Sequence, residues 1–136
     1  IENGLLACAS VHEGITVERN FANQIPTINA DLDQLKRVFT NLFDNAIAAM
    51  EGEGTLGVST SYDHDLQTTR IEIADTGSGI KPEDKDRLFL PYFSRKRGGT
   101  GLGLAIVHQI VADHSGYVRV SDNHPRGTVM TIELPC

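Results

Sequence analysis

Two asparagines, Asn41 and Asn45, stand four residues apart in the stretch Asn41-Leu-Phe-Asp-Asn45. On a helix, residues i and i+4 share one face, so the two side-chain amides would project side by side. An amide oxygen is a hard, neutral ligand that suits Mg²⁺, which commonly completes its shell with phosphate oxygens and water. A solvated polar helix face would use the same residues, so this pair by itself leaves both interpretations open.

Asp75 opens the stretch Asp75-Thr-Gly-Ser-Gly-Ile80 at the end of an expected strand. Its carboxylate can accept a hydrogen bond from an exocyclic amine. Gly77 and Gly79 would let the backbone approach a flat ligand closely. An ordinary Asp–Gly turn is the alternative.

A glycine-rich stretch, Gly98-Gly-Thr-Gly-Leu-Gly-Leu104, runs directly into an expected helix. Free backbone amides at a helix N-terminus, with the helix dipole behind them, form a ready anion site. Thr100 is placed to cap this helix, and Gly101 and Gly103 keep its first turn open to a phosphate. The chain contains no GxxxxGKS/T sequence, and the dinucleotide spacing GxGxxG fails at Leu104. A glycine-rich hinge is the alternative.

Between the two glycine clusters, the stretch Arg87–Arg97 places apolar residues before three cations. Leu88, Phe89 and Phe93 would anchor this segment to the body of the domain, and Arg95–Arg97 would form its tip. A mobile lid with a basic tip would close over a polyphosphate. A charge run is also typical of a solvated loop.

The elements that must position these residues follow from hydrophobic spacing and turn residues. Asp31 can cap a helix, Gln34 completes a capping box, and apolar residues at helical spacing then give one buried face. That pattern ends at Met50, where Gly52 and Gly54 mark the stop. The other expected elements are strands over Ile15–Phe21, Thr55–Tyr62, Thr69–Asp75, Tyr117–Asp122 and Thr128–Leu134 and a helix over Gly101–His114. This order predicts the α+β class, a two-layer α/β sandwich with helices on one face of a mixed five-stranded sheet.

Length and charge limit the possible functions. The 136 residues fit one domain over 1–136. The formal net charge is −6, and an acidic protein repels a phosphate backbone, so non-specific nucleic-acid binding is not expected. No apolar run reaches the ~18–20 residues of a membrane span. Because the chain starts at Ile1, we expect it to be a piece of a longer protein.

Taken together and in this order, these elements resemble the catalytic ATP-binding domain of sensor histidine kinases. The boxes of that family are matched by Asn41–Asn45 (N box), Asp75–Gly79 (G1), Leu88–Phe93 (F), Gly99–Leu104 (G2) and Gly127–Thr131 (G3). Within the family, Asp33–Met50 is most similar to the nitrogen-regulation type. The resemblance implies the Bergerat fold, an α/β sandwich with about three helices on one face of the sheet and a mobile ATP lid. This fold carries the ATP sites of gyrase, a heat-shock chaperone, mismatch-repair proteins and histidine kinases.

The resemblance also implies roles for the matched residues. Asp75 would accept the adenine amine, and the Thr128 hydroxyl would help through a water molecule. Asn45 would bind an Mg²⁺ ion that bridges the phosphates, with Asn41 beside it. The residues implied in nucleotide contact are Asn45, Asp75, Gly77, Gly79, Ile80, Phe93, Lys96, Gly99, Thr100, Gly101, Leu102, Gly103, Leu104 and Thr128, and those implied in catalysis are Asn41, Asn45 and Lys96.

The chain departs from the family pattern at two positions on the first helix. Many of these kinases carry a cation three residues after the Mg²⁺ asparagine, where this chain has Ala48. The positive charge would then come from Lys96 or Arg95 on the lid, reaching toward the γ-phosphate. ATPases of the superfamily carry a water-activating Glu where this chain has Asn41, so we expect slow ATP hydrolysis.

None of the five histidines lies in the family's phospho-acceptor motif, since His12-Glu13 is followed by Gly14 and an expected strand. The acceptor histidine and the dimerisation helices are therefore expected outside this chain. The implied cofactors are ATP and Mg²⁺, and the implied partners are the kinase's own dimerisation domain and a response regulator. This piece would be a monomeric cytoplasmic domain of a homodimeric protein, with or without an inner-membrane anchor.

Two other functions fit the same fold. A serine kinase of the anti-sigma-factor type would normally carry the Glu that Asn41 replaces. A nucleotide-dependent docking module would bind nucleotide without transferring phosphate. An acid-labile histidyl phosphate formed from ATP would distinguish the histidine kinase from both.

Overall fold

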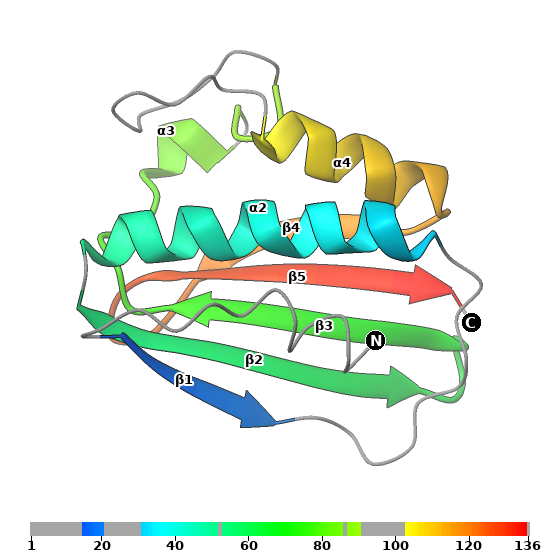
Figure 1. Ribbon diagram of the computed structural model, residues 1–136, viewed down its shortest axis with the longest axis horizontal. Helices are drawn as coiled ribbons and strands as arrows, with labels where there is room; N and C mark the ends of the chain where they lie inside the picture. The colour runs from blue at the N-terminus through cyan, green and yellow to red at the C-terminus, as the bar shows by residue number, and fades with distance from the viewer. Residues whose placement is uncertain (1–14, 21–30, 52, 86, 91–102, 136) are drawn as a thin grey trace.

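One mixed sheet, covered on one face by helices, makes up the computed structural model, which describes residues 15–20, 31–51, 53–85, 87–90 and 103–135 (Figure 1). The strands are β1 (Ile15–Asn20), β2 (Gly54–Asp63), β3 (Thr68–Asp75), β4 (Tyr117–Asp122) and β5 (Thr128–Pro135). The helices are α2 (Leu32–Met50), α3 (Pro82–Lys85) and α4 (Gly103–Asp113). This arrangement confirms the expected α+β two-layer sandwich, with element ends within two residues of the predicted ones.

The five strands lie in the order β1-β2-β3-β5-β4. β1 runs parallel to β2, with Ile15 opposite Gly54, and all other neighbours are antiparallel. β2 and β3 form an antiparallel hairpin. β3 is the central strand, so Asp75 at its end lies between the start of β2, where it pairs with Leu56, and the start of β5.

Helix α2 begins and ends through specific backbone contacts. The Asp31 carboxylate accepts hydrogen bonds from the backbone N–H groups of Asp33 (3.0 Å) and Gln34 (3.2 Å), which confirms the predicted N-cap. The N–H of Asp31, which a capping box would pair with Gln34, donates instead to His114 Nε2. The helix ends at Met50 as predicted, but the left-handed residue there is Glu51, with a φ of 54°, and not a glycine.

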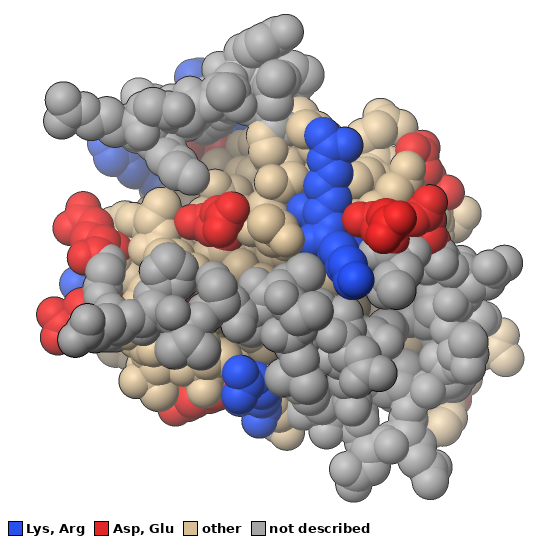
Figure 2. All heavy atoms as spheres, viewed as in Figure 1, with Lys and Arg blue, Asp and Glu red and all other residues tan. Residues whose placement is uncertain are grey.

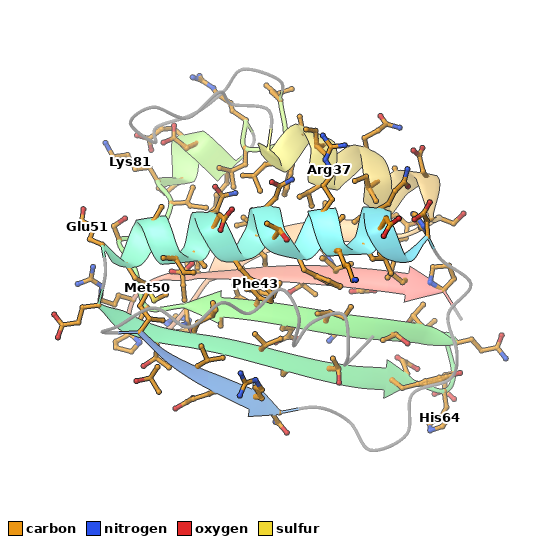
Figure 3. All side chains as sticks on the ribbon, in the orientation of Figure 1. Arg37, Phe43, Met50, Glu51, His64 and Lys81 are labelled. Atoms are coloured by element: carbon orange, nitrogen blue, oxygen red, sulfur yellow. The ribbon has the colours of Figure 1, made fainter. Side chains whose placement is uncertain are left out.

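The core lies between the helices and the sheet. Figure 3 shows Phe43 and Met50 directed from α2 toward the sheet and Arg37 directed away from it. Phe39 and Phe43 stack with ring centroids 6.5 Å apart. Full burial of such a side chain contributes ~1.5–3 kcal/mol, so this face holds α2 on the sheet. Nine apolar positions at helical spacing were expected to form the buried faces of the two long helices. Seven of them are buried, namely Leu35, Val38, Leu42, Ala46, Val107, Ile110 and Val111, whereas Ala49 and Leu104 are half-buried.

Helix α3 lies in a stretch for which no helix or strand was expected. Pro82 suits the first helical position, where no N–H partner is needed. Lys85 Nζ forms an ion pair with Asp122 Oδ1 at 2.7 Å, which joins α3 to the end of β4. Farther along, Phe89 packs against α4, its ring centroid 5.7 Å from that of His108. The expected lid tip, Arg95–Arg97, lies outside the described residues.

The surface agrees with the acidic composition. On the face shown in Figure 2, Lys and Arg side chains of the described residues form one narrow strip with Asp and Glu side chains beside it, and the other basic side chains lie apart from that strip. Among the described helices, none is long and apolar enough to cross a membrane.

Candidate functional site

Asp75 is a buried carboxylate at the C-terminal end of the central strand. Only 6% of the residue is exposed. Its Oδ1 accepts hydrogen bonds from the backbone N–H groups of Gly77 (2.9 Å) and Thr128 (3.2 Å). Among the described residues both donors bond to Oδ1, which leaves Oδ2 as an acceptor for a further donor.

Burial raises the pKa of the Asp75 carboxyl above its ordinary value, because desolvation disfavours the charged form. The N–H groups of Gly77 and Thr128 favour the charged form and oppose that shift in part. A buried acid with a perturbed pKa at the end of a strand is a typical feature of a binding site.

A loop after β4 is tied to the Asp75 backbone. Asn123 Nδ2 donates to the Asp75 carbonyl at 2.7 Å, and the N–H of Asn123 donates to the Gly127 carbonyl at 3.0 Å. Arg126 Nε donates to the Gly77 carbonyl at 2.9 Å. The loop carrying Thr128 and the loop following Asp75 therefore form one bonded unit. Asn123 and Arg126 were not predicted from the sequence, because neither lies within one of the family's boxes.

Gly77 lies against the C-terminal end of α2. A Cβ atom at this position would come 2.6 Å from both the carbonyl carbon and oxygen of Ala49, closer than real Cβ contacts allow. Ser78 N–H donates to the Ala49 carbonyl at 3.1 Å. Gly77 and Gly79 were both expected to let the backbone approach a ligand closely. At Gly77, however, a side chain is excluded by the packing of this loop against α2. Gly79 has a φ of 80°, a conformation that favours glycine.

The two predicted asparagines lie on the stripe of α2 that joins this loop to α4. Asn41 Nδ2 donates to the carbonyl of Gly103, the first residue of α4, at 3.4 Å. Two turns later, Ala49 contacts the loop of Gly77. Asn45 lies one turn from each of these contacts and is half-buried. α2 therefore places Asn45 between the Asp75 loop and the start of α4.

A magnesium ion bound at this stripe would need ligands from elsewhere. The described residues contain no group of three or more His, Cys, Asp or Glu side chains that could hold a metal. Half-buried, neutral amides such as Asn45 and Asn41 suit Mg²⁺ as partial ligands, provided that phosphate oxygens and water supply the rest. The donor set therefore fits a metal that arrives with a phosphate ligand.

The structure thus brings together one part of the predicted site directly. Asp75, Gly77 and Thr128 share hydrogen bonds, Asn41 contacts Gly103, and Ile80 and Leu104 pack against the core. The remaining predicted residues lie outside the described residues; they are Phe93, Arg95, Lys96, Gly99, Thr100, Gly101 and Leu102.

Residues 30–136 match the family model described as "Histidine kinase-, DNA gyrase B-, and HSP90-like ATPase". Sensor histidine kinase ZraS of Escherichia coli (strain K12) is 40% identical over 111 residues, which cover 82% of this chain and 23% of ZraS. Sensory histidine kinase/phosphatase NtrB of Rhodobacter capsulatus is 35% identical over 130 residues, which cover 88% of this chain and 36% of NtrB. The chain therefore corresponds to only a part of each relative.

Solved structures of histidine kinases share this fold. Full-length ShkA in complex with AMPPNP has a TM-score of 0.78 and 32% identity, over 90% of this chain and 26% of that chain. The catalytic domain of ThkA has a TM-score of 0.80 and 29% identity, over 98% of this chain and 84% of that chain. ThkA in complex with the response regulator protein TrrA has a TM-score of 0.75 and 26% identity, over 98% of this chain and 36% of that chain.

Proposed function

The chain belongs to the family of histidine kinase-, DNA gyrase B- and HSP90-like ATPases, and on that basis we propose that it binds Mg-ATP and donates the γ-phosphoryl group to a histidine of a two-component sensor kinase. Buried Asp75 carries this proposal, since its carboxylate is held by two backbone N–H groups at one end of the asparagine stripe. ShkA, which shares the fold, was crystallised with AMPPNP.

Asp75 would read the purine. Its Oδ1 is occupied by Gly77 and Thr128, so Oδ2 would accept a hydrogen bond from the exocyclic amine of adenine. Guanine carries a carbonyl at the equivalent position, and two acceptors would then face each other. The Thr128 hydroxyl would assist through a water molecule, and Gly79 and Ile80 would line the same end of the site.

The phosphates would lie between α2 and the start of α4. Asn45, with Asn41 beside it, would hold Mg²⁺, which neutralises phosphate charge when bound. Backbone N–H groups from Gly101 to Leu104 would bind phosphate oxygens at the helix N-terminus. Lys96 would supply the cation that Ala48 does not provide, reaching toward the γ-phosphate.

Phosphoryl transfer requires positioning and charge neutralisation more than covalent help from the protein. A neutral imidazole nitrogen of the acceptor histidine would attack the γ-phosphorus in line, forming a P–N bond. The bond from that phosphorus to the bridging oxygen would break, releasing ADP. Asn41 occupies the position at which a general base would activate water, so hydrolysis of ATP by the isolated chain should be slow.

The acceptor histidine and the dimerisation helices would lie in another part of the kinase, with a homodimer as the full assembly. The chain corresponds to 23% of ZraS and 36% of NtrB, which leaves room for such segments. A response regulator would then receive the phosphoryl group. ThkA, which shares the fold, was crystallised in complex with the response regulator protein TrrA. In this proposal, residues 1–136 form the ATP-binding domain of the kinase and lie in the cytoplasm.

Calorimetric titration of ADP with Mg²⁺ into the wild type and Asp75→Asn tests the proposal. Asparagine keeps an oxygen for Gly77 and Thr128 but presents an NH₂ group to the adenine amine. We expect the wild type to bind ADP and not GDP, and Asp75→Asn to bind ADP at least about tenfold more weakly. Asp44→Asn, an exposed carboxylate on α2, is the matched control and should bind like the wild type.

Transfer itself is tested with ATP and a separate acceptor domain that carries a histidine. An acid-labile phosphate on that domain is the expected product. An acid-stable seryl phosphate as the product would instead indicate a serine kinase. Binding of ADP without any phosphoryl transfer would indicate a nucleotide-dependent docking module.

A further inference from the structure

His114, the residue after α4, bonds two helices at once. Its Nδ1 lies 2.8 Å from the Ile110 carbonyl on its own helix. Its Nε2 lies 3.1 Å from the backbone nitrogen of Asp31, the N-cap of α2, which is 83 residues away in the chain. The ring is half-buried.

The partners fix the state of the ring. A carbonyl only accepts, so Nδ1 must carry the hydrogen that bonds to Ile110. The backbone N–H of Asp31 only donates, so Nε2 must present a lone pair. His114 is therefore assigned as the neutral imidazole with hydrogen on Nδ1.

A second contact joins the same two helices at the other end of α4. Asn41 Nδ2 donates to the Gly103 carbonyl at 3.4 Å. Asp31 and Asn41 are 41 − 31 = 10 residues apart, and Gly103 and His114 are 114 − 103 = 11 residues apart. At a rise of about 1.5 Å per residue these spans are about 15 Å and about 16.5 Å, so the contacts pair antiparallel helices at matched positions.

We propose that His114 is a positioning residue whose bridge from Ile110 to Asp31 sets the placement of α4 along α2, and thereby the placement of Gly103 against Asn41. Because a hydrogen bond is directional, the bond from Asp31 to His114 adds a constraint on sliding of α4 along α2 to the one that helix packing provides. The inference rests on the proposed function, because Gly103 and Asn41 belong to the proposed phosphate end of the site. His114 itself lies at the opposite end of α4 and contacts no nucleotide in this scheme.

Two substitutions distinguish the bond from His114 to Asp31 from the bond within α4 to Ile110. His114→Gln places an amide oxygen where Nε2 stands, so it can still accept from Asp31. His114→Asn places an amide NH₂ where Nδ1 stands, so it can still donate to Ile110 but does not reach Asp31. Both variants are uncharged, and His64→Gln on the β2–β3 turn is the control for loss of a histidine elsewhere.

The first measurement is NMR of the wild type with ¹⁵N-labelled histidine and asparagine. We expect the ring signals of His114 to carry the signature of hydrogen on Nδ1 at neutral pH. The side-chain NH₂ signals of Asn41 should shift in His114→Asn and stay near wild type in His114→Gln. A purely local structural role would leave the Asn41 signals unchanged in both variants.

The second measurement is ADP affinity. We expect His114→Asn to bind about three- to tenfold more weakly than the wild type, and His114→Gln and His64→Gln to bind within about twofold of it. Hydrogen on Nε2, or unchanged Asn41 signals with equal ADP affinity in both variants, would overturn the inference. Failure of the wild type to bind ADP would instead overturn the proposed function, while the Asn41 signals would still decide the role of His114.

Discussion

The α-carbon of Gly127 lies so close to Asp75 that a Cβ atom at position 127 would overlap the Asp75 carbonyl oxygen. Gly127 also has a φ of 107°, which L side chains rarely adopt. The same carbonyl accepts the Asn123 side-chain amide. The end of β3 and the loop before β5 are therefore fitted to each other through backbone atoms, and the Asp75 carboxylate is placed by that fit.

Gly127→Ala should destabilise the fold and weaken ADP binding, whereas Gly103→Ala should not destabilise it. A Cβ atom on Gly103 would lie 3.8 Å from Asn41 Cγ and Oδ1, an ordinary contact distance. Alanine at such a position stabilises by about 0.4–1 kcal/mol through the unfolded state. Urea unfolding of both variants measures the difference, and equal stability of the two would contradict the steric argument.

Asn123→Ala should lower the free energy of unfolding by about 1–3 kcal/mol, because it leaves the Asp75 carbonyl without its side-chain donor. ADP binding should weaken as well, since the loop carrying Thr128 loses a tie to the strand. Asn20→Ala, at the exposed end of β1, is the matched control and should change neither quantity appreciably. Thermal unfolding and calorimetry together check both effects.

ADP affinity should fall as pH falls, beginning at a higher pH than an ordinary aspartate would give. The pKa of Asp75 is raised by burial. A protonated carboxyl can carry its hydrogen on Oδ2, which then donates, whereas the Oδ2 of the ionised carboxylate always accepts. Titrations from about pH 8 to about pH 5 measure this dependence. In Asp75→Asn the residual affinity should lose it.

The raised pKa of Asp75 has the opposite effect on the stability of the nucleotide-free protein: the Asp75 contribution to stability falls as pH rises, whereas ADP affinity rises. The folded state binds the Asp75 proton more tightly than the unfolded chain. Its contribution is therefore fully present below the unfolded pKa and is lost as pH rises through the folded pKa. Asp75→Asn should remove this contribution, so the difference in unfolding free energy between variant and wild type should change with pH in that window.

Asn45→Ala should abolish the Mg²⁺ dependence of ADP affinity while leaving the fold intact. The side chain is half-buried one turn from Asn41, and alanine is the better helix former. Calorimetry with and without Mg²⁺ measures the change. If Mg²⁺ strengthened binding equally in wild type and variant, the proposed ligand would be wrong.

Stability should depend on the core under α2 far more than on the ion pairs of the open sheet face. Phe39 is 2% exposed, so Phe39→Ala should cost about 3–5 kcal/mol. Glu133 forms ion pairs with Arg70 and Arg119, but these arginine side chains are 48% and 64% exposed. Glu133→Gln should therefore change stability by no more than about 1 kcal/mol in urea unfolding.

Much of this protein follows from local patterns in its sequence. The apolar positions of α2 recur at helical spacing, Asp31 caps the helix, and the turn after Asp63 separates two alternating strands. These features depend on residues a few positions apart, so the elements, the buried face and the α+β class were predictable. The spacing of Asn41 with Asn45 and the position of Asp75 at a strand end predicted the candidate site from equally local patterns.

Only the tertiary structure decided how these pieces meet. Asp31 donates to His114 across 83 residues, Asn41 to Gly103 across 62, and Asn123 to Asp75 across 48. Ala49 leaves no room for a side chain at position 77, and no residue near Gly77 in the sequence indicates this packing. Such contacts are set by which elements the sheet order places side by side. The sequence therefore determined the chemical groups and their elements, and long-range packing determined their distances, their burial and the raised pKa of Asp75.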